Sequence, residues 1–195
     1  MAKLQRSSPS SRYFYPWPVV LVSCVDEKGK PNIITIGASS ICSSNPPTVG
    51  IAVGTMQYSL TLINQTCDFG VNLPRADQVR QVDFCGSKSG RNMNKFEAAG
   101  FTVQRSLLIR SPLIEECPVS MECKLIETVH LGNHDWLIGE IVAVYCDESI
   151  LDEAGNFDPS KCNPLFAFWS EYWSIGAKLA DWHFMRRESC LGDQA

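Results

Sequence analysis

Short apolar runs rich in β-branched residues recur along the chain and are separated by polar turn segments. Residues 26–30 separate the first two runs, and Asn45-Pro46-Pro47 precedes the third, because a central strand excludes consecutive prolines. Two longer runs flank residues 131–135 and predict a hairpin. The pattern therefore predicts strands at Val19–Val25, Asn32–Ile36, Thr48–Val53, Asp68–Leu73, Val119–Val129 and Trp136–Tyr145.

The periodicity changes in three short segments, which predict helices. Met56–Thr66 places Leu60 and Ile63 on one side, and Asn94–Ala99 ends before Gly100. The third segment is Gln78–Phe84. Many strands and few helices, without a regular alternation of the two, indicate a mostly β fold: an antiparallel barrel with short flanking helices.

The length and composition indicate one domain. A chain of 195 residues with 45% hydrophobic and 19% charged residues can bury a substantial core. No internal repeat, low-complexity block or linker divides the chain. We expect one domain at residues 16–185, between an N-terminal tail at 1–15 and a C-terminal tail at 186–195.

Charge and cysteine content restrict the partners and the compartment. Seventeen basic and 21 acidic side chains give a net charge of −4, which argues against nucleic-acid binding. No apolar run approaches the ~18 residues of a membrane helix, and we expect no signal peptide. The nine cysteines are odd in number and lack the C-x-x-C spacing. They are expected to be reduced packing thiols in a soluble cytoplasmic protein.

Residues 31–67 contain no Asp, Glu, Lys or Arg but many hydroxyl and amide side chains. A surface loop normally carries charge, so this composition suits a flat, partly apolar ligand with hydrogen-bonding edges and a phosphate. Ala38-Ser39-Ser40 allows the backbone to approach a ring closely, and Pro46-Pro47 stiffens the loop beyond it. The alternative is a serine-rich loop that caps the barrel or faces a subunit.

Several other chemistries lack their signatures. Residues 86–91, Gly-Ser-Lys-Ser-Gly-Arg, do not have the spacing of a nucleoside-triphosphatase loop, and the chain contains neither G-x-G-x-x-G nor G-x-S-x-G. His130 and His134 have the spacing of helical zinc ligands, but Gly132-Asn133 between them predicts a turn. We expect no metal site and no Rossmann-type nicotinamide site.

Four segments, in this order along the chain, carry a combined signal: Asn32–Pro47; Gln57–Ile63 with Phe69–Pro74; Cys85–Phe96; and Glu122–Lys124 with Leu131–Glu140. Together they resemble the flavin reductase-like family, whose members include flavoredoxin and small NAD(P)H:flavin oxidoreductases. Each segment alone is a weak signal, but the set covers residues 16–182 and is specific.

The resemblance implies an FMN-binding split barrel, an antiparallel Greek-key barrel that works as a homodimer with FMN at the subunit interface. Ser39, Ser40, Ile41 and Cys42 would then border the isoalloxazine ring through backbone N–H groups and hydroxyls. A donor at the reactive ring nitrogen tunes hydride acceptance, and Cys42 is placed nearest to it, with simple packing as the alternative. Further cofactor-binding residues implied in this segment are Asn32, Thr35 and Ala38.

The resemblance also implies a phosphate site. Tyr58, Ser59 and Thr61 lie at the start of the predicted helix, where N–H groups and hydroxyls form an anion site. Relatives often have a basic residue before the Tyr-Ser pair, whereas this chain has Gln57. Positive charge would come from either subunit, and the candidates are Lys88, Arg91 and Lys95. The alternative for these three is a solvated charged loop.

The C-terminal part of the chain is dense in aromatic side chains. Trp169, Tyr172 and Trp173 resemble the segment with which the family closes over the flavin or the partner chain. Trp173 is the cofactor-binding candidate among them. A cluster beside Gly176 could leave room for a flat ring, and packing in the core is the alternative.

The predicted function is that of an NAD(P)H-dependent flavin reductase. Hydride would pass from NADH or NADPH to FMN, and electrons would leave to a small-molecule or protein acceptor. Such a transfer depends on positioning and electrostatics, so no catalytic residue is assigned. A flavoredoxin-like carrier, which accepts electrons from a protein partner and has little nicotinamide activity, is the alternative. A flavin-free barrel used for assembly is a third possibility.

Overall fold

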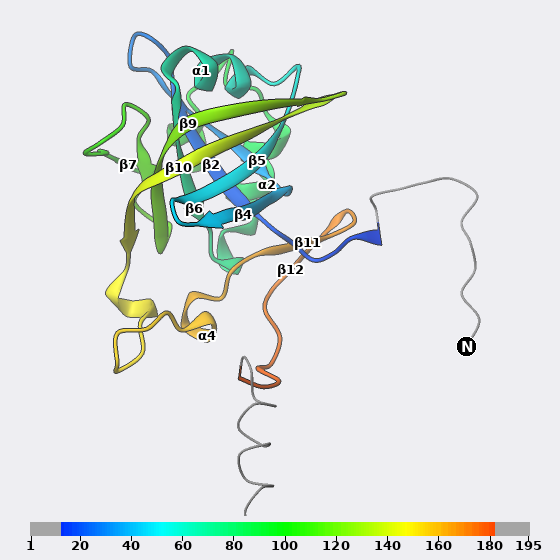
Figure 1. The fold of residues 1–195 in the computed structure, drawn as a ribbon, viewed down its shortest axis with the longest axis vertical. Helices are drawn as coiled ribbons and strands as arrows, with labels where there is room; N and C mark the ends of the chain where they lie inside the picture. The colour runs from blue at the N-terminus through cyan, green and yellow to red at the C-terminus, as the bar shows by residue number, and fades with distance from the viewer. Residues whose placement is uncertain (1–12, 182–195) are drawn as a thin grey trace, which may run out of the picture.

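The computed structural model describes residues 13–181, and its centre is one curved antiparallel sheet of seven strands (Figure 1). The strand order is β3-β2-β6-β9-β10-β5-β4, and every neighbouring pair is antiparallel. The strands are β2 (Val20–Val25), β3 (Pro31–Ile36), β4 (Ser39–Ser44), β5 (Pro47–Gly54), β6 (Asp68–Leu73), β9 (Val119–Leu131) and β10 (His134–Cys146).

The sheet curls around a single apolar core. Its buried side chains include Val22, Ile34, Ile51, Phe69 and Leu137, which come from five different strands. The outermost strands of a flat seven-stranded sheet would lie about 29 Å apart, since neighbouring strands are separated by about 4.8 Å. In such a flat sheet β3 and β5, which are five steps apart, would be separated by about 24 Å and could not share one cluster, so the sheet closes toward a barrel.

The barrel remains open along one seam. β3 and β4 stand at the two ends of the strand order and are not paired with each other, although only Gly37 and Ala38 separate them in the chain. Helix α1 (Tyr58–Thr66) carries the chain from β5 back to β6, which lies beside β2. The predicted mostly β split barrel with short flanking helices is confirmed.

Smaller elements flank the barrel. A second sheet has the order β1-β11-β12, and β7 pairs with β8. Helices α2 and α3 pack on the barrel through a second apolar cluster around Val82, Cys85 and Phe96. The bounds are β1 (Trp17–Pro18), β7 (Val103–Gln104), β8 (Leu113–Ile114), β11 (Phe166–Phe168), β12 (Glu171–Trp173), α2 (Val79–Ser87), α3 (Lys95–Ala99), α4 (Pro159–Cys162), and the 3₁₀ helices η2 (Ala76–Gln78) and η3 (Glu148–Ile150).

The predicted strands and helices are all present, with ends that differ by at most three residues. The predicted stop after Ala99 is also confirmed, because Gly100 adopts a left-handed conformation with φ of 72°. One prediction is wrong: Ser39–Ser44 is not a loop but strand β4, with a register shift between Ile41 and Ser43. Its small side chains are mostly exposed, so no apolar alternation marked it as a strand.

The expected domain limits remain predictions. The boundary between residues 185 and 186 lies outside the described residues, as does most of the expected N-terminal tail. Between residues 13 and 181, no helix is both long enough and apolar enough to cross a bilayer.

Candidate functional site

The open seam of the barrel contains a cavity of about 910 Å³. Its wall is formed by β3, the two-residue link, β4, β5, β10 and the residue that precedes α1. The lining residues are Phe14, Trp17, Ile34, Thr35, Ile36, Gly37, Ala38, Ser39, Ser40, Ala52, Gly54, Gln57, Leu131, His134 and Trp136.

Five of the residues expected to bind a cofactor lie in this wall, namely Thr35, Ala38, Ser39, Ser40 and Gln57. The Thr35 hydroxyl donates to the Val82 carbonyl at 2.5 Å and so fixes β3 against α2. β4 pairs only with β5, so the N–H and C=O groups of its other edge point away from the sheet. Backbone and hydroxyl groups of β4 are therefore available at the seam.

The cavity wall is uncharged. Among the described residues, no Asp, Glu, Lys or Arg lines it, and His134 is its one titratable side chain. Indole and aliphatic side chains provide apolar surface, while Thr35, Ser39 and Ser40 provide hydroxyls. Such a wall favours a flat neutral ring system with polar edges, because it can cover apolar faces and still satisfy hydrogen bonds.

Trp136 enters the wall because Gly50 has no side chain. A Cβ atom at Gly50 would overlap the indole ring of Trp136. The two residues lie on paired strands, with Trp136 opposite Ala52 in the β10–β5 register. Glycine at position 50 therefore lets the indole approach the backbone of β5.

The start of α1 adjoins the cavity through Gln57, its N-cap residue. The Gln57 side chain makes no capping hydrogen bond, and the first turn contains no acidic residue. Ser59 is buried, and its hydroxyl accepts a hydrogen bond from Asn32 Nδ2 at 2.8 Å. Thr61 is exposed on the same helix. A helix start of this kind attracts an anion.

The loop between α2 and α3, residues 88–94, contacts the start of α1. The guanidinium carbon of Arg91 lies 4.8 Å from the centre of the Tyr58 ring. Gly90 lies against Asn32, since a Cβ atom at Gly90 would overlap Asn32 Oδ1. Within the described part of the chain, that buried oxygen has no hydrogen-bond partner. Lys88 is exposed at the end of α2. The structure thus brings Asn32, Tyr58, Ser59 and Arg91 together.

Lys95 is buried and holds backbone groups. Its Nζ donates to the carbonyl oxygens of Ile33 at 2.8 Å and Cys85 at 2.7 Å. Burial lowers the pKa of this ammonium, and the neighbouring Cys85 and Cys24 act in the opposite direction. The side chain ties α3 to β3 and α2, and it does not line the cavity.

Three other expected residues lie outside the cavity wall of this chain. The Ile41 side chain is exposed, and Cys42 lies in the register shift of β4, where its Sγ is 3.8 Å from the Ser40 carbonyl oxygen. Trp173 is exposed on β12, and its Nε1 donates to Glu171 Oε2 at 3.1 Å. These residues can face a ligand only from outside the seam.

Several residues of the wall were not expected from the sequence, and they include Phe14, Trp17, Leu131, His134 and Trp136. His134 and Trp136 are two positions apart on β10 and therefore share a face. Their alternation was visible in the sequence, but the pairing of β10 with β5, which aims that face at the seam, was not. His134 Nδ1 lies 2.9 Å from Asn133 Oδ1 at the tip of the hairpin.

Each histidine of the β9–β10 hairpin lies beside a polar side chain of the same hairpin. His130 Nδ1 is 2.9 Å from Asp135 Oδ1, its neighbour across the hairpin. Across residues 13–181, no group of three or more His, Cys, Asp and Glu side chains is placed to hold a metal ion.

Most of the chain is similar to one group of known proteins. The profile of the flavin reductase like domain matches residues 11–172. Flavoredoxin of Desulfovibrio vulgaris (Miyazaki F) is 31% identical, with a TM-score of 0.86 over 93% of this chain and 98% of that one. A split-barrel domain protein of Shewanella frigidimarina shares the fold, at 23% identity and a TM-score of 0.79 over 87% and 86%. FMN reductase (NADH) RutF of Bradyrhizobium diazoefficiens is 25% identical over 73% of this chain and 83% of that protein.

Proposed function

Because the chain belongs to the flavin reductase-like family, we propose that it is an oxidoreductase that binds FMN in the open seam of the barrel. One observation carries the proposal: an uncharged cavity of about 910 Å³ adjoins an uncapped helix start. FMN has the same two parts, since a neutral three-ring system is joined through a ribityl chain to a phosphate.

The residues of the seam fit the ring system. Ser39, Ser40 and the outer edge of β4 offer hydrogen bonds to the polar edge of the ring. Trp17 and Trp136 offer apolar surface for its faces. The cavity volume of about 910 Å³ lies within the range of about 300–1,000 Å³ that is usual for sites that bind cofactors and similar ligands. These residues would bind and orient the ring and shield it from water.

We assign the phosphate to the start of α1. The N–H groups of the first turn, the hydroxyls of Ser59 and Thr61, and the exposed Lys88 and Arg91 are its proposed partners. A phosphate carries about −1.5 to −2 charge, and removing it from water requires cationic help. Lys95 supports this site indirectly, because its buried ammonium fixes α3, which follows the loop that carries Arg91.

Bound FMN would supply a ring that accepts a hydride from NADH or NADPH and yields electrons to a small-molecule or protein acceptor. The chain would contribute positioning and hydrogen bonds. His134 is the titratable side chain of the described wall, and we assign it no proton-transfer role. A flavin reductase is therefore the leading version of the proposal.

A flavoredoxin-like carrier is the second version, and the similarity to flavoredoxin over nearly the whole chain favours it. Such a protein would take electrons from a protein partner and react slowly with nicotinamide. Both versions use the same cavity, and they differ in whether a nicotinamide can reach the ring.

We further propose that the protein is a cytoplasmic homodimer. Leu131, in the cavity wall, is 57% exposed, while Ile41 and Trp173, outside that wall, are 62% and 52% exposed. A partner subunit would cover such apolar side chains and bring Ile41, Cys42 or Trp173 to the cofactor from outside the seam. All eight described cysteines are free, as suits a reducing compartment.

The visible spectrum of the purified protein tests FMN binding. We expect a flavin spectrum, either as purified or after FMN is added and the excess removed. A protein that stays colourless after both steps would refute the proposal. Turnover of NADH or NADPH with excess free FMN then separates the two versions. Many turnovers support the reductase, whereas absent nicotinamide oxidation in a flavin-loaded protein supports the carrier.

A further inference from the structure

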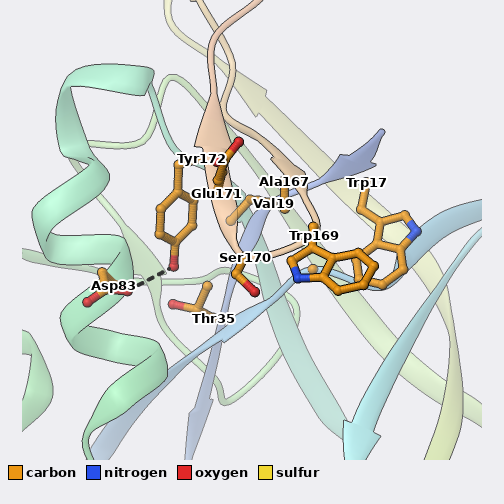
Figure 2. A pocket seen from close by; sticks show the side chains of 10 residues that line it. Trp17, Val19, Thr35, Asp83, Ala167, Trp169, Ser170, Glu171 and Tyr172 are labelled. Carbon is orange, nitrogen blue, oxygen red and sulfur yellow. Dashed lines mark hydrogen bonds between the residues drawn. The ribbon is translucent and has the colours of Figure 1, made fainter. Parts of the chain in front are cut away.

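A second, smaller cavity of about 250 Å³ lies beside the open seam (Figure 2). It forms where the β11–β12 hairpin lies against β3 and α2. Trp17, Thr35 and Gly37 line both this cavity and the larger one, so the two adjoin. A molecule seated in the small cavity would therefore border whatever occupies the large one.

The wall of the small cavity is aromatic and acidic. Figure 2 shows Tyr172 and Asp83 on one side and Trp17 and Trp169 on the other. Glu171 also lines the cavity, and no Lys, Arg or His of the described residues does so. Aromatic faces and carboxylates both attract positive charge, so the wall favours a cationic ligand.

Hydrogen bonds hold both carboxylates in place. The Tyr172 hydroxyl donates to Asp83 Oδ1 at 3.2 Å, and Trp173 Nε1 donates to Glu171 Oε2 at 3.1 Å. Burial, together with the charge of Asp83, raises the pKa of Tyr172 to about 12, so the phenol remains a protonated donor. Asp83 takes part in no ion pair with any residue in 13–181, and Arg80, one turn earlier on α2, does not line the cavity.

We propose that this cavity binds the head group of an organic cation, an alkylammonium or arylammonium, whose remainder extends toward the larger cavity. Its indole and phenol rings would contact the alkyl groups of the ammonium while Asp83 neutralises the charge. A bare metal ion is a poorer match, because no cluster of metal-ligating side chains is present within the described residues. If FMN occupies the larger cavity, as the proposed function requires, a molecule that exchanges electrons with it from the small cavity would carry positive charge.

Isothermal titration of the FMN-treated protein with benzyltrimethylammonium chloride tests the proposal, and benzyl alcohol is the neutral probe. Ionic strength is held constant with sodium chloride. We expect saturable binding of the cation and at least tenfold weaker binding of the alcohol. Equal affinity for the two probes would overturn the assignment.

Substitutions locate the binding. Asp83→Asn keeps the size of the side chain and should weaken cation binding at least fivefold, and Trp169→Leu should weaken it as well. Glu153→Gln removes the same charge from an exposed loop that does not line the cavity, and it should leave the affinity unchanged. Unchanged affinity in both Asp83→Asn and Trp169→Leu, with native circular dichroism, would overturn the proposal.

The flavin content of the same samples separates this proposal from the proposed function. Protein that holds FMN but does not bind the cation contradicts the small-cavity assignment alone. Protein that binds the cation without ever holding FMN contradicts the proposed function and supports the cavity.

Discussion

At the scale of single residues, Arg91 is the side chain on which the phosphate assignment can be tested most directly. Its side chain is exposed and lies over the face of Tyr58, so its removal should not disturb the fold. We expect Arg91→Gln to weaken FMN binding about tenfold, which is about 1.4 kcal/mol, because one charged partner of the phosphate is lost. Binding of riboflavin, which lacks the phosphate, should be unchanged.

Quenching of flavin fluorescence measures both affinities for the Arg91 variant. Arg80→Gln, a matched loss of one positive charge on α2 outside the cavity wall, serves as the control. An equal loss of FMN and riboflavin affinity in Arg91→Gln would contradict the assignment of Arg91 to the phosphate.

Gly50 permits a second prediction at this scale. In Gly50→Ala the new methyl group would overlap the Trp136 indole, so we expect a loss of about 1–3 kcal/mol in the free energy of unfolding. Weaker FMN binding should accompany it, because Trp136 lines the cavity. Urea denaturation measures the first effect. Gly176→Ala, where a Cβ atom would meet nothing within 4 Å, should be neutral. A fully stable Gly50→Ala would show that the indole moves freely.

The sequence was informative about residue types in the site and poor about side-chain directions. The uncharged run pointed to Ser39 and Ser40, and both line the cavity. Nothing in the sequence distinguishes Lys95 from a lysine exposed to solvent. Its ammonium is buried because α3 packs against β3. Cys42 was a candidate through the family resemblance, but the register shift in β4 decides where its thiol lies.

At the scale of elements, Glu122 on β9 fixes the long loop between β7 and β8. Its carboxylate is fully buried and accepts hydrogen bonds from the N–H groups of Leu107 at 2.8 Å and Leu108 at 2.7 Å, and from the Tyr145 hydroxyl at 2.7 Å. Burial raises the pKa of Glu122, but these hydrogen bonds outweigh it and hold the pKa below its usual value. The ionised carboxylate therefore stabilises the fold.

The sign of this pKa shift predicts a pH dependence. Glu122→Gln should lower the free energy of unfolding at pH 7 by about 1–3 kcal/mol, since it leaves buried donors poorly paired. The native carboxylate contributes fully above the ordinary Glu pKa of about 4.3, and its contribution is lost as pH falls through the lower folded pKa. The difference between wild type and variant should shrink in that acidic range.

Urea unfolding at neutral and acidic pH measures the effect of Glu122. Glu127→Gln, an exposed position on the same strand, should change stability little at either pH. A difference between wild type and Glu122→Gln that stays constant with pH would refute the role of ionised Glu122.

The elements differ in how far the sequence could reveal them. β2, β3, β9 and β10 are long or β-branched enough to show in the pattern, whereas β1, β11 and β12 have two or three residues. Strands of two or three residues are stabilised by the strands with which they pair. The partner of β1 is β11, about 150 residues further along the chain. Sequence periodicity does not report such a contact.

At the scale of the whole molecule, the exposed apolar side chains in and beside the cavity wall predict self-association. Ile41→Asp places a charge at the outer edge of β4 without altering the cavity wall. We expect it to weaken the proposed dimer at least tenfold, as seen in sedimentation velocity over a dilution series. Leu107→Asp, which adds the same charge at an exposed leucine outside the cavity wall, should leave association intact. A wild-type protein that is monomeric at all concentrations would contradict the proposed homodimer.

The unpaired outer edge of β4 has a practical consequence for handling the protein. Charged residues and proline on an edge strand normally discourage pairing between chains, and β4 contains neither. An open edge of this kind can template intermolecular β-structure when nothing covers it. Preparations kept with excess FMN should therefore remain clear on storage for longer than preparations from which FMN has been removed. In the latter, aggregation would start by pairing of the exposed β4 edges and would not require global unfolding.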